Sequence, residues 1–183
     1  AQESRGLGDV YKRQSKVTFP GAGISAIAAS AANIAEIKQR MQPQTIGFDK
    51  INQLRHVRFL KDADGIAAHM RKHAALLRPK FELVQDTLER ELSDCGCTWS
   101  HPRGGYFVSF NAPEHSAKRI VALCKEAGVT LTGAGATWPH KNDPHDSNIR
   151  IAPSLPPIEE LQQALEVFVV CVKLAAVEAQ LAQ

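Results

Sequence analysis

Between Pro79 and Gln183 the sequence alternates helical and extended patterns, and their order constrains the fold more than any other feature. Hydrophobic periodicity and turn residues predict helix, strand, helix, strand, strand, helix. Such an order favours a small α/β sandwich, in which helices cover a mixed sheet. The segments behind this prediction are a helix from Pro79 to about Cys95, extended runs at Thr98–Trp99 and Tyr106–Phe110, a helix over Ser116–Ala127, strands at Val129–Thr132 and Asn148–Ala152, and a helix from Pro156 to Ala182.

The residues before Pro79 are predicted to be mainly helical and to form the edge of a different domain. A short strand at Val17–Phe19 is broken by the Pro20-Gly21 pair, and a helix is expected over Ile24–Met41. A second helical stretch is expected from an Asp49 N-cap to about His73, interrupted near Asp62–Gly65. Its apolar positions recur at helical spacing; they are Ile51, Leu54, Val57 and Leu60.

Composition and charge exclude several classes of function. The chain has 183 residues, 44% hydrophobic and 22% charged, as in an ordinary globular protein. Its net charge of +3 comes without a dense lysine or arginine run, and aromatic residues are few, so nucleic acid is a poor partner. No apolar run approaches the roughly 20 residues that span a bilayer. The lack of a secretory signal favours a reducing, cytoplasmic location for the four cysteines.

The first 14 residues differ from the rest. They are polar and without clear period, and Arg5–Gln14 resembles a translated sequencing adaptor. We therefore expect residues 1–14 to be a foreign or disordered extension. We also expect the chain, which begins with alanine, to be a fragment of a longer protein.

Lys16 is the first candidate for a catalytic residue. A lysine that forms a Schiff base needs a lowered pKa and a rigid turn that points its amine at an aldehyde. The sequence from Ser15 to Gly23 offers a strand end and a glycine-containing turn into a helix, whose backbone amides suit a phosphate. From these residues alone, a solvated surface lysine is the alternative.

Arg150 is the second candidate. Strand alternation places Ile149 and Ile151 on one face and Arg150 on the other. An arginine on a strand face suits a carboxylate, which it can bind with two parallel hydrogen bonds. An exposed strand arginine without a ligand is the alternative.

Six short motifs occur in a fixed order from Ser15 to Gln183. They are Ser15-Lys16 with Gly21-Ala22-Gly23, Asn52–Phe59, His69–His73, Gly104–Phe107, Gly128-Val129 with Gly133–Gly135, and Asn148–Ala152. Together they resemble the C-terminal part of fold-type I, pyridoxal-phosphate-dependent class I aminotransferases, in particular the bacterial subgroup of aspartate aminotransferases. Each motif alone is weak, whereas the ordered set is specific.

The resemblance implies an α/β chain that is a C-terminal fragment of the pyridoxal-phosphate-dependent transferase fold. Residues 15–76 would be a remnant of the large cofactor-binding domain, with long helices. Residues 77–183 would be the small C-terminal α/β sandwich domain. Because most of the large domain's sheet is missing, we expect the apolar faces within Val17–His73 to be exposed.

The resemblance also implies the chemistry. Lys16 would bind pyridoxal 5'-phosphate as a Schiff base and would move the proton between the substrate α-carbon and the cofactor. Arg150 would hold the α-carboxylate of the substrate. The expected reaction transfers an amino group between an amino acid, aspartate, and a 2-oxo acid, 2-oxoglutarate, in a homodimer. The alternative is the aminotransferase-like domain of a pyridoxal-phosphate-dependent transcriptional regulator.

The chain departs from the family pattern at and before the lysine. The serine that contacts the phosphate in the family stands three residues before the lysine, where this chain has Arg13. Most of the family's cofactor site lies further upstream and has no counterpart here. We therefore expect this fragment to be inactive in isolation.

Four further groups of residues have weaker functional interpretations. The loop with His140, Asp143, His145 and Asp146 could bind a metal, but a solvated loop is the favoured interpretation. The family resemblance implies substrate gating as its functional alternative. The group Cys95, Cys97 and His101 is interpreted as incidental, so no metal site is expected. Arg55 or Arg58 is a candidate for contacting a dicarboxylic substrate. The run Gly133–Thr137 lacks the lysine of a nucleotide loop.

Overall fold

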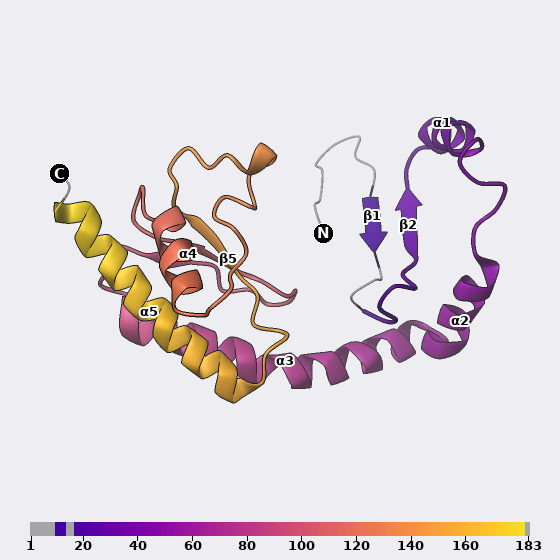
Figure 1. The fold of residues 1–183 in the computed structure, drawn as a ribbon. Coiled ribbons are helices and arrows are strands. Elements are labelled where there is room, and N and C mark those ends of the chain that lie inside the picture. The colour runs from indigo at the N-terminus through magenta and orange to yellow at the C-terminus, as the bar shows by residue number, and fades with distance from the viewer. Residues whose placement is uncertain (1–9, 14–16, 182–183) are drawn as a thin grey trace. The chain divides into compact units, whose positions relative to one another are not determined.

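The computed structural model describes residues 10–13 and 17–181 (Figure 1). The chain divides into two compact units, Ala1–His73 and Ala74–Gln183. One long helix, α3 (Ala63–Leu92), contributes its first residues to one unit and the rest to the other.

The first unit contains a two-stranded ladder and the helices that follow it. Strand β1 (Val10–Arg13) pairs antiparallel with β2 (Ser25–Ala28). Helix α1 (Ala31–Met41) and helix α2 (Lys50–Leu60) come next, before the start of α3. Strand β1 lies within the segment that the sequence sets apart as an extension; the origin of that segment stays a prediction.

Side-chain caps explain where these helices begin. The Ser30 hydroxyl accepts a hydrogen bond from the backbone N–H of Asn33 at the start of α1. The Asp49 carboxylate accepts one from Asn52 N–H at 2.8 Å, as the sequence predicts for an N-cap. The predicted interruption is also confirmed, because α2 ends at Leu60 and α3 begins at Ala63.

The first unit buries few apolar side chains. Its α2 helix buries His56 and Leu60. By contrast, Ile51 is 83% exposed and Val57 is 63% exposed, although both occupy the apolar positions of the helical repeat. The expectation of exposed apolar faces in this region is therefore confirmed.

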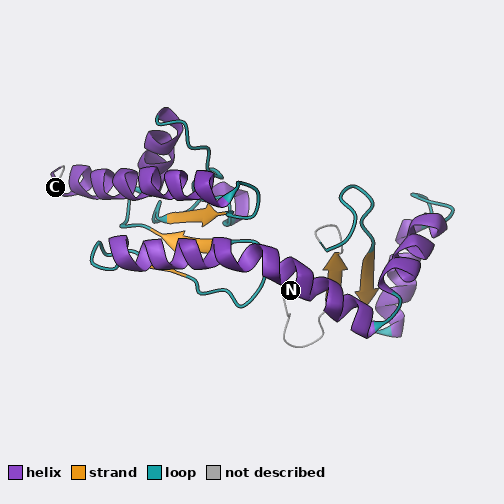
Figure 2. Cartoon of the chain, turned by 90° about the horizontal axis from the view of Figure 1, so that it is seen from below, coloured by secondary structure: helices purple, strands orange, loops and turns teal. Residues whose placement is uncertain are grey.

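The second unit has a three-stranded antiparallel sheet in the order β3-β4-β5. Its strands are β3 (Thr98–Trp99), β4 (Val108–Asn111) and β5 (Asn148–Ile151). Helix α4 (Ala117–Glu126) and helix α5 (Ile158–Leu181) pack with α3 around one face of this sheet, and a 3₁₀ turn, η1 (Pro139–Lys141), precedes β5 (Figure 2).

Strand alternation gives the sheet one apolar and one polar face. The apolar face buries Val108 and Phe110 of β4 and Ile149 and Ile151 of β5. There Phe110 meets Phe168 of α5 edge to face, with the ring centroids 5.1 Å apart. The α3 residues Val84, Leu88 and Leu92, spaced one helical turn apart, are fully buried in the same core. Burial of this core is the main source of stability in the second unit.

Several predicted elements are wrong in detail. Val17–Phe19 is not a strand, and the paired strand is β2, within the segment predicted as a helix. The alanines there favour a helix, but backbone pairing with β1 decides the conformation, and Ser30 delays the helix start. Pro79 does not begin a helix, because it lies inside α3.

The predicted strand at Val129–Thr132 is also wrong, as is the mixed sheet. Within the described residues, this segment runs without a ladder partner, and every paired strand of the sheet is antiparallel. Gly128, at φ +87°, ends α4, and the Val129 N–H returns a hydrogen bond to the Cys124 carbonyl at 2.7 Å. The apolar residues Val129 and Leu131 alternate with threonines, and this alternation resembles the pattern of a strand.

Candidate active site

Arg150 stands on the polar face of β5, opposite Ser109 of β4. Its guanidinium carbon lies 4.5 Å from the centroid of the Phe107 ring, a cation–π contact. Its Nε atom is buried and has no hydrogen-bond partner among the described residues. A buried donor of a charged group is costly to leave unpaired, so this atom indicates a site for an acceptor.

The turn before β4 explains how Phe107 reaches Arg150. Gly105 adopts a φ of +94°, which favours glycine at this turn. The chain then enters β4 with Ser109 opposite Arg150, which places Phe107 on the neighbouring diagonal position. The Gly104–Phe107 motif thus supplies an aromatic wall for the guanidinium.

A network of amide and hydroxyl groups continues this polar face. Asn148, two residues before Arg150, donates from Nδ2 to the Ser109 hydroxyl at 3.0 Å and to Asn111 Oδ1 at 2.7 Å. Its Oδ1 accepts a hydrogen bond of 2.5 Å from the Thr137 hydroxyl. The network fixes the start of β5, and it ties the Gly133–Thr137 loop to the strand that carries Arg150.

Asp143 organises the loop before β5. Its carboxylate accepts hydrogen bonds from the backbone N–H groups of His145, Ser147 and Asn148, at 2.8 to 3.0 Å. Burial opposes ionisation, but these three donors outweigh it and hold the pKa of Asp143 below its usual value. The interpretation of this loop as simply solvated is therefore wrong for Asp143, which is buried.

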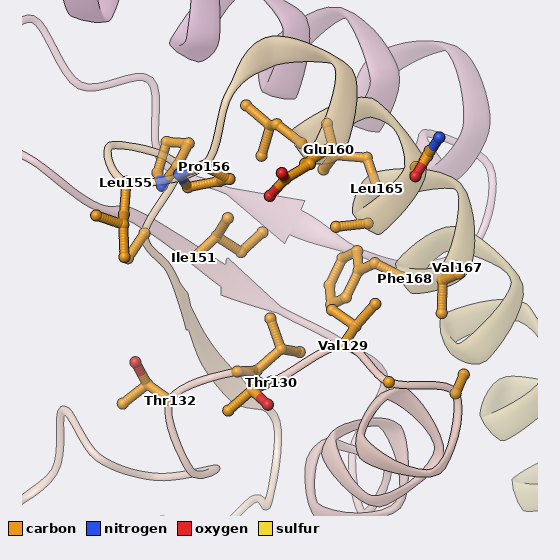
Figure 3. A pocket seen from close by; sticks show the side chains of 18 of the residues that line it. Val129, Thr130, Thr132, Ile151, Leu155, Pro156, Glu160, Leu165, Val167 and Phe168 are labelled. Atoms are coloured by element: carbon orange, nitrogen blue, oxygen red, sulfur yellow. The ribbon is translucent and has the colours of Figure 1, made fainter.

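A hollow of about 590 Å³ lies at one edge of the second unit (Figure 3). Its walls are the segment 127–132, the β5–α5 connection and the first turns of α5. The labelled side chains are mostly apolar, and Thr130, Thr132 and Glu160 are the polar ones among them. Arg150 and Glu160 are the charged residues of the lining, and no His, Cys or Lys side chain accompanies them among its described residues.

Lys16 lies outside the described residues, whereas the segment that follows it, from Val17, is described. Phe19–Ala22 forms a type II turn, with Pro20 at its second position, Gly21 at φ +78° and an Ala22 N–H to Phe19 carbonyl bond of 3.1 Å. The break predicted at Pro20-Gly21 is therefore confirmed.

Side chains of α2 and α3 bind the segment Val17–Ala22, which contains this turn, at three points. His69 Nε2 lies 2.6 Å from the Val17 carbonyl oxygen, and His56 Nε2 lies 2.7 Å from the Thr18 hydroxyl. Asn52 donates from Nδ2 to the Ala22 carbonyl at 3.0 Å. Sequence reasoning missed these contacts, although all three side chains lie in motifs that carry the family resemblance.

Arg55 and Arg58, the candidates for contacting a dicarboxylic substrate, are both exposed on α2. The guanidinium of Arg55 lies over the Phe19 ring, 4.1 Å from its centroid.

The structure also describes the residues that were considered as metal ligands. Burial, with a smaller contribution from Cys95, raises the pKa of the Cys97 thiol to about 11, so this thiol is protonated at neutral pH. Across the described part of the chain, no three His, Cys, Asp or Glu side chains gather to hold a metal ion.

A family model described as aspartate amino-transferase matches residues 6–183. The chain belongs to this family. The aspartate aminotransferase of Corynebacterium glutamicum is 46% identical over 169 residues, which are 92% of this chain and 39% of that protein.

Solved structures of aminotransferases share the fold. An aspartate transaminase from Corynebacterium glutamicum matches with a TM-score of 0.88 and 45% identity, over 92% of this chain and 40% of that one. The multiple substrate aminotransferase of Thermococcus profundus matches with a TM-score of 0.81 over 96% of this chain and 43% of that one; at 19% identity it supports the fold alone. These matches confirm the aminotransferase family and the α/β class. The chain spans about two fifths of the length of the relatives that it matches.

Among helices in the described ranges, none is both long and apolar enough to cross a membrane.

Proposed function

We propose that this chain is part of an aminotransferase that exchanges an amino group between aspartate and 2-oxoglutarate. The family match and the aspartate aminotransferase relative support the reaction class. The observation that carries the proposal in the structure is the buried, unpartnered Nε of Arg150 on a polar sheet face.

Arg150 holds the substrate α-carboxylate in this proposal. A guanidinium presents a planar set of donors that suits two parallel bonds to a carboxylate. Phe107 limits the guanidinium's motion on one side, and the Asn148 network fixes the strand beneath it. Holding the carboxylate orients the bond between the substrate α-carbon and its hydrogen for proton removal.

Pyridoxal 5'-phosphate is the cofactor in this proposal, and it supplies the electron sink when bound. The described residues fit the use of this cofactor where the substrate binds, because the unpartnered Nε of Arg150 is a cationic donor for the carboxylate of the amino-acid substrate. Lys16 is the residue that binds the cofactor aldehyde and moves the proton at the substrate α-carbon. We further propose that the complete protein acts as a cytoplasmic homodimer.

A chimera tests the proposed function. Residues 15–183 replace the matching part of the Corynebacterium glutamicum aspartate aminotransferase, which supplies the residues that precede Ser15. We expect the chimera to form glutamate from L-aspartate and 2-oxoglutarate with added cofactor, while the isolated 183-residue chain forms none. A folded chimera without activity would overturn the proposal, and glutamate formation by the isolated chain would refute the expectation that the fragment is inactive.

The alternative is a transcriptional regulator with an aminotransferase-like domain. The relative described above is named an aspartate aminotransferase, and this favours the enzyme. If the chain belongs to such a regulator, we expect the chimera to bind the cofactor but not to convert aspartate.

A further inference from the structure

We infer that Asn148 and Thr137 are positioning residues for Arg150, an inference that rests on the proposed function. Asn148 and Arg150 lie two residues apart on β5, and strand alternation places their side chains on the same face of the sheet. Neither Asn148 nor Thr137 contacts the substrate in this inference. They act on Arg150 by fixing the strand that carries it and the loop that leads into that strand.

The Asn148 side chain has a defined orientation. The Phe110 carbonyl lies 3.4 Å from Nδ2, and a carbonyl oxygen can only accept a hydrogen bond, so the nitrogen of the Asn148 amide faces β4. The shorter bonds of Nδ2 go to the Ser109 hydroxyl, at 3.0 Å, and to Asn111 Oδ1, at 2.7 Å. Asn148 is 8% exposed, so water competes little for these bonds.

The Asn148 amide holds the residue directly opposite Arg150. Ser109 is the register partner of Arg150, and the β-carbons of such cross-strand partners lie about 4.5–5.5 Å apart. Phe107, two residues before Ser109, contacts the Arg150 guanidinium with its ring. The bond from Asn148 to Ser109 therefore joins β4 to β5 beside the place where Arg150 meets Phe107.

The other end of the Asn148 side chain binds the loop before β5. An amide oxygen carries no hydrogen, so the Thr137 hydroxyl donates to Asn148 Oδ1, across 2.5 Å. Two further bonds join the loop to the Asn148 backbone. The Gly135 N–H donates to the Asn148 carbonyl at 3.1 Å, and the Asn148 N–H donates to the Asp143 carboxylate at 2.8 Å. The loop is thus attached at three points to the residue two positions before Arg150.

Gly135 allows the loop to lie this close. Its φ is +71°, and a β-carbon there would lie 3.0 Å from the Lys141 carbonyl oxygen and 3.3 Å from the Asp143 β-carbon. Any other residue would be strained and would crowd Asp143. The backbone therefore suits a loop that stays against β5, where the Thr137 hydroxyl reaches Asn148.

A double-mutant cycle in the chimera tests the inference. Asn148→Ala removes both ends of the side-chain amide, and we expect it to lower kcat/KM for L-aspartate about 10- to 100-fold, because the guanidinium is misplaced. Since Asn148 acts through Arg150, the same change should lower kcat/KM less than about twofold in the Arg150→Ala background. A residue that only supports the fold would lower it by the same factor in both backgrounds.

Thr137 provides a conservative pair of variants. Thr137→Val loses the hydroxyl that donates to Asn148, and we expect it to lower kcat/KM about three- to tenfold, the effect of losing one hydrogen bond. Thr137→Ser keeps the hydroxyl and should recover most of this loss. Thr98→Val is the control: it removes a hydroxyl of β3 that binds Asn111 and not Asn148, and we expect kcat/KM within about twofold of wild type.

NMR of the full 183-residue chain gives a readout that needs neither cofactor nor turnover. The Nε–H signal of Arg150, identified by its loss in Arg150→Lys, reports how firmly the side chain is held. We expect its hydrogen exchange with solvent to be at least about threefold faster in Asn148→Ala and Thr137→Val, and unchanged in Thr98→Val.

The inference and the proposed function fail in different ways. Equal losses of kcat/KM in both backgrounds, no loss in either Asn148→Ala or Thr137→Val, or unchanged exchange of the Arg150 Nε–H in these two variants overturns the inference alone. A folded chimera that is inactive, or one in which Arg150→Ala leaves kcat/KM unchanged, overturns the proposed function and the inference with it. If Asn148→Ala does not fold, Thr137→Val undergoes the same cycle with Arg150→Ala, and equal losses there overturn the inference.

Discussion

At the scale of single residues, Arg150 carries most of the functional interpretation. Its strand position and the family motif both follow from the sequence, and the structure adds its contact with Phe107 and its unpaired Nε. The Asn148 network was not predicted, because its partners come from β4 and from a loop more than ten residues away. Such long-range polar contacts leave no periodic signal in the sequence.

Replacement of Arg150 in the chimera should weaken the use of aspartate. We expect Arg150→Ala to lower kcat/KM for L-aspartate about 10²- to 10³-fold, because a charged hydrogen-bonding partner of the substrate is lost in a partly buried site. Arg150→Lys should recover only part of this loss, since an ammonium cannot form two parallel bonds. Steady-state kinetics measures the effect, with the exposed Arg103→Ala as control. Equal kcat/KM for Arg150→Ala and the control would contradict the assignment.

At the scale of elements, long amphipathic segments were predicted well and short ones poorly. The face of α3 that contains Val84 and Leu88 is buried as its helical spacing predicts. A proline is favoured in the first turn of a helix, so the sequence predicts a helix start at Pro79, but α3 runs continuously through this residue from Ala63 to Leu92. The segment Val129–Thr132 has no ladder partner within the described residues, which shows that an alternating apolar pattern does not reveal whether a strand partner exists.

The loop that leads into β5 should be sensitive to acid through Asp143. Its folded-state pKa is below the unfolded value of about 3.9, so its stabilisation is present above pH 4 and is lost as the pH falls through the folded pKa. We expect Asp143→Asn to lower the free energy of unfolding by about 1–3 kcal/mol at pH 7, and by less at pH 3. Urea unfolding followed by tryptophan fluorescence measures this, because Trp99 and Trp138 both lie in the second unit.

The matched control for this loop is the exposed Asp86→Asn on α3. We expect it to leave the free energy of unfolding within about 0.5 kcal/mol of wild type at both pH values. An Asp143→Asn variant that behaves like this control would show that the three backbone hydrogen bonds contribute nothing measurable to stability.

At the scale of the whole molecule, the chain combines one unit with a closed core and one unit without. Residues 74–183 bury a contiguous cluster from three helices and the sheet, whereas α2 leaves Ile51, Leu54 and Val57 exposed. The family resemblance predicts this contrast, because it implies that most of the large domain's sheet is missing. The hydrophobic pattern alone does not, because it cannot show whether a surface is present to cover the apolar residues of α2. The proposed division at residues 76/77 stays a proposal about domains.

The two units should differ in their resistance to proteolysis. We expect a protease at limiting concentration to cut the isolated chain first within residues 17–60, where few side chains are buried, and to leave a fragment that covers most of 74–183. Mass spectrometry of the time course identifies the cuts. Equal protection of both units would count against this account.

The central claim is that Lys16 is the cofactor-binding lysine of an aminotransferase. Its most direct test compares Lys16→Ala with Lys38→Ala in the chimera; Lys38 is an exposed lysine of α1. We predict that Lys16→Ala lowers glutamate formation more than about 10³-fold and abolishes the absorbance of covalently bound cofactor, while Lys38→Ala changes neither. A Lys16→Ala chimera that keeps both the activity and the absorbance would contradict the claim.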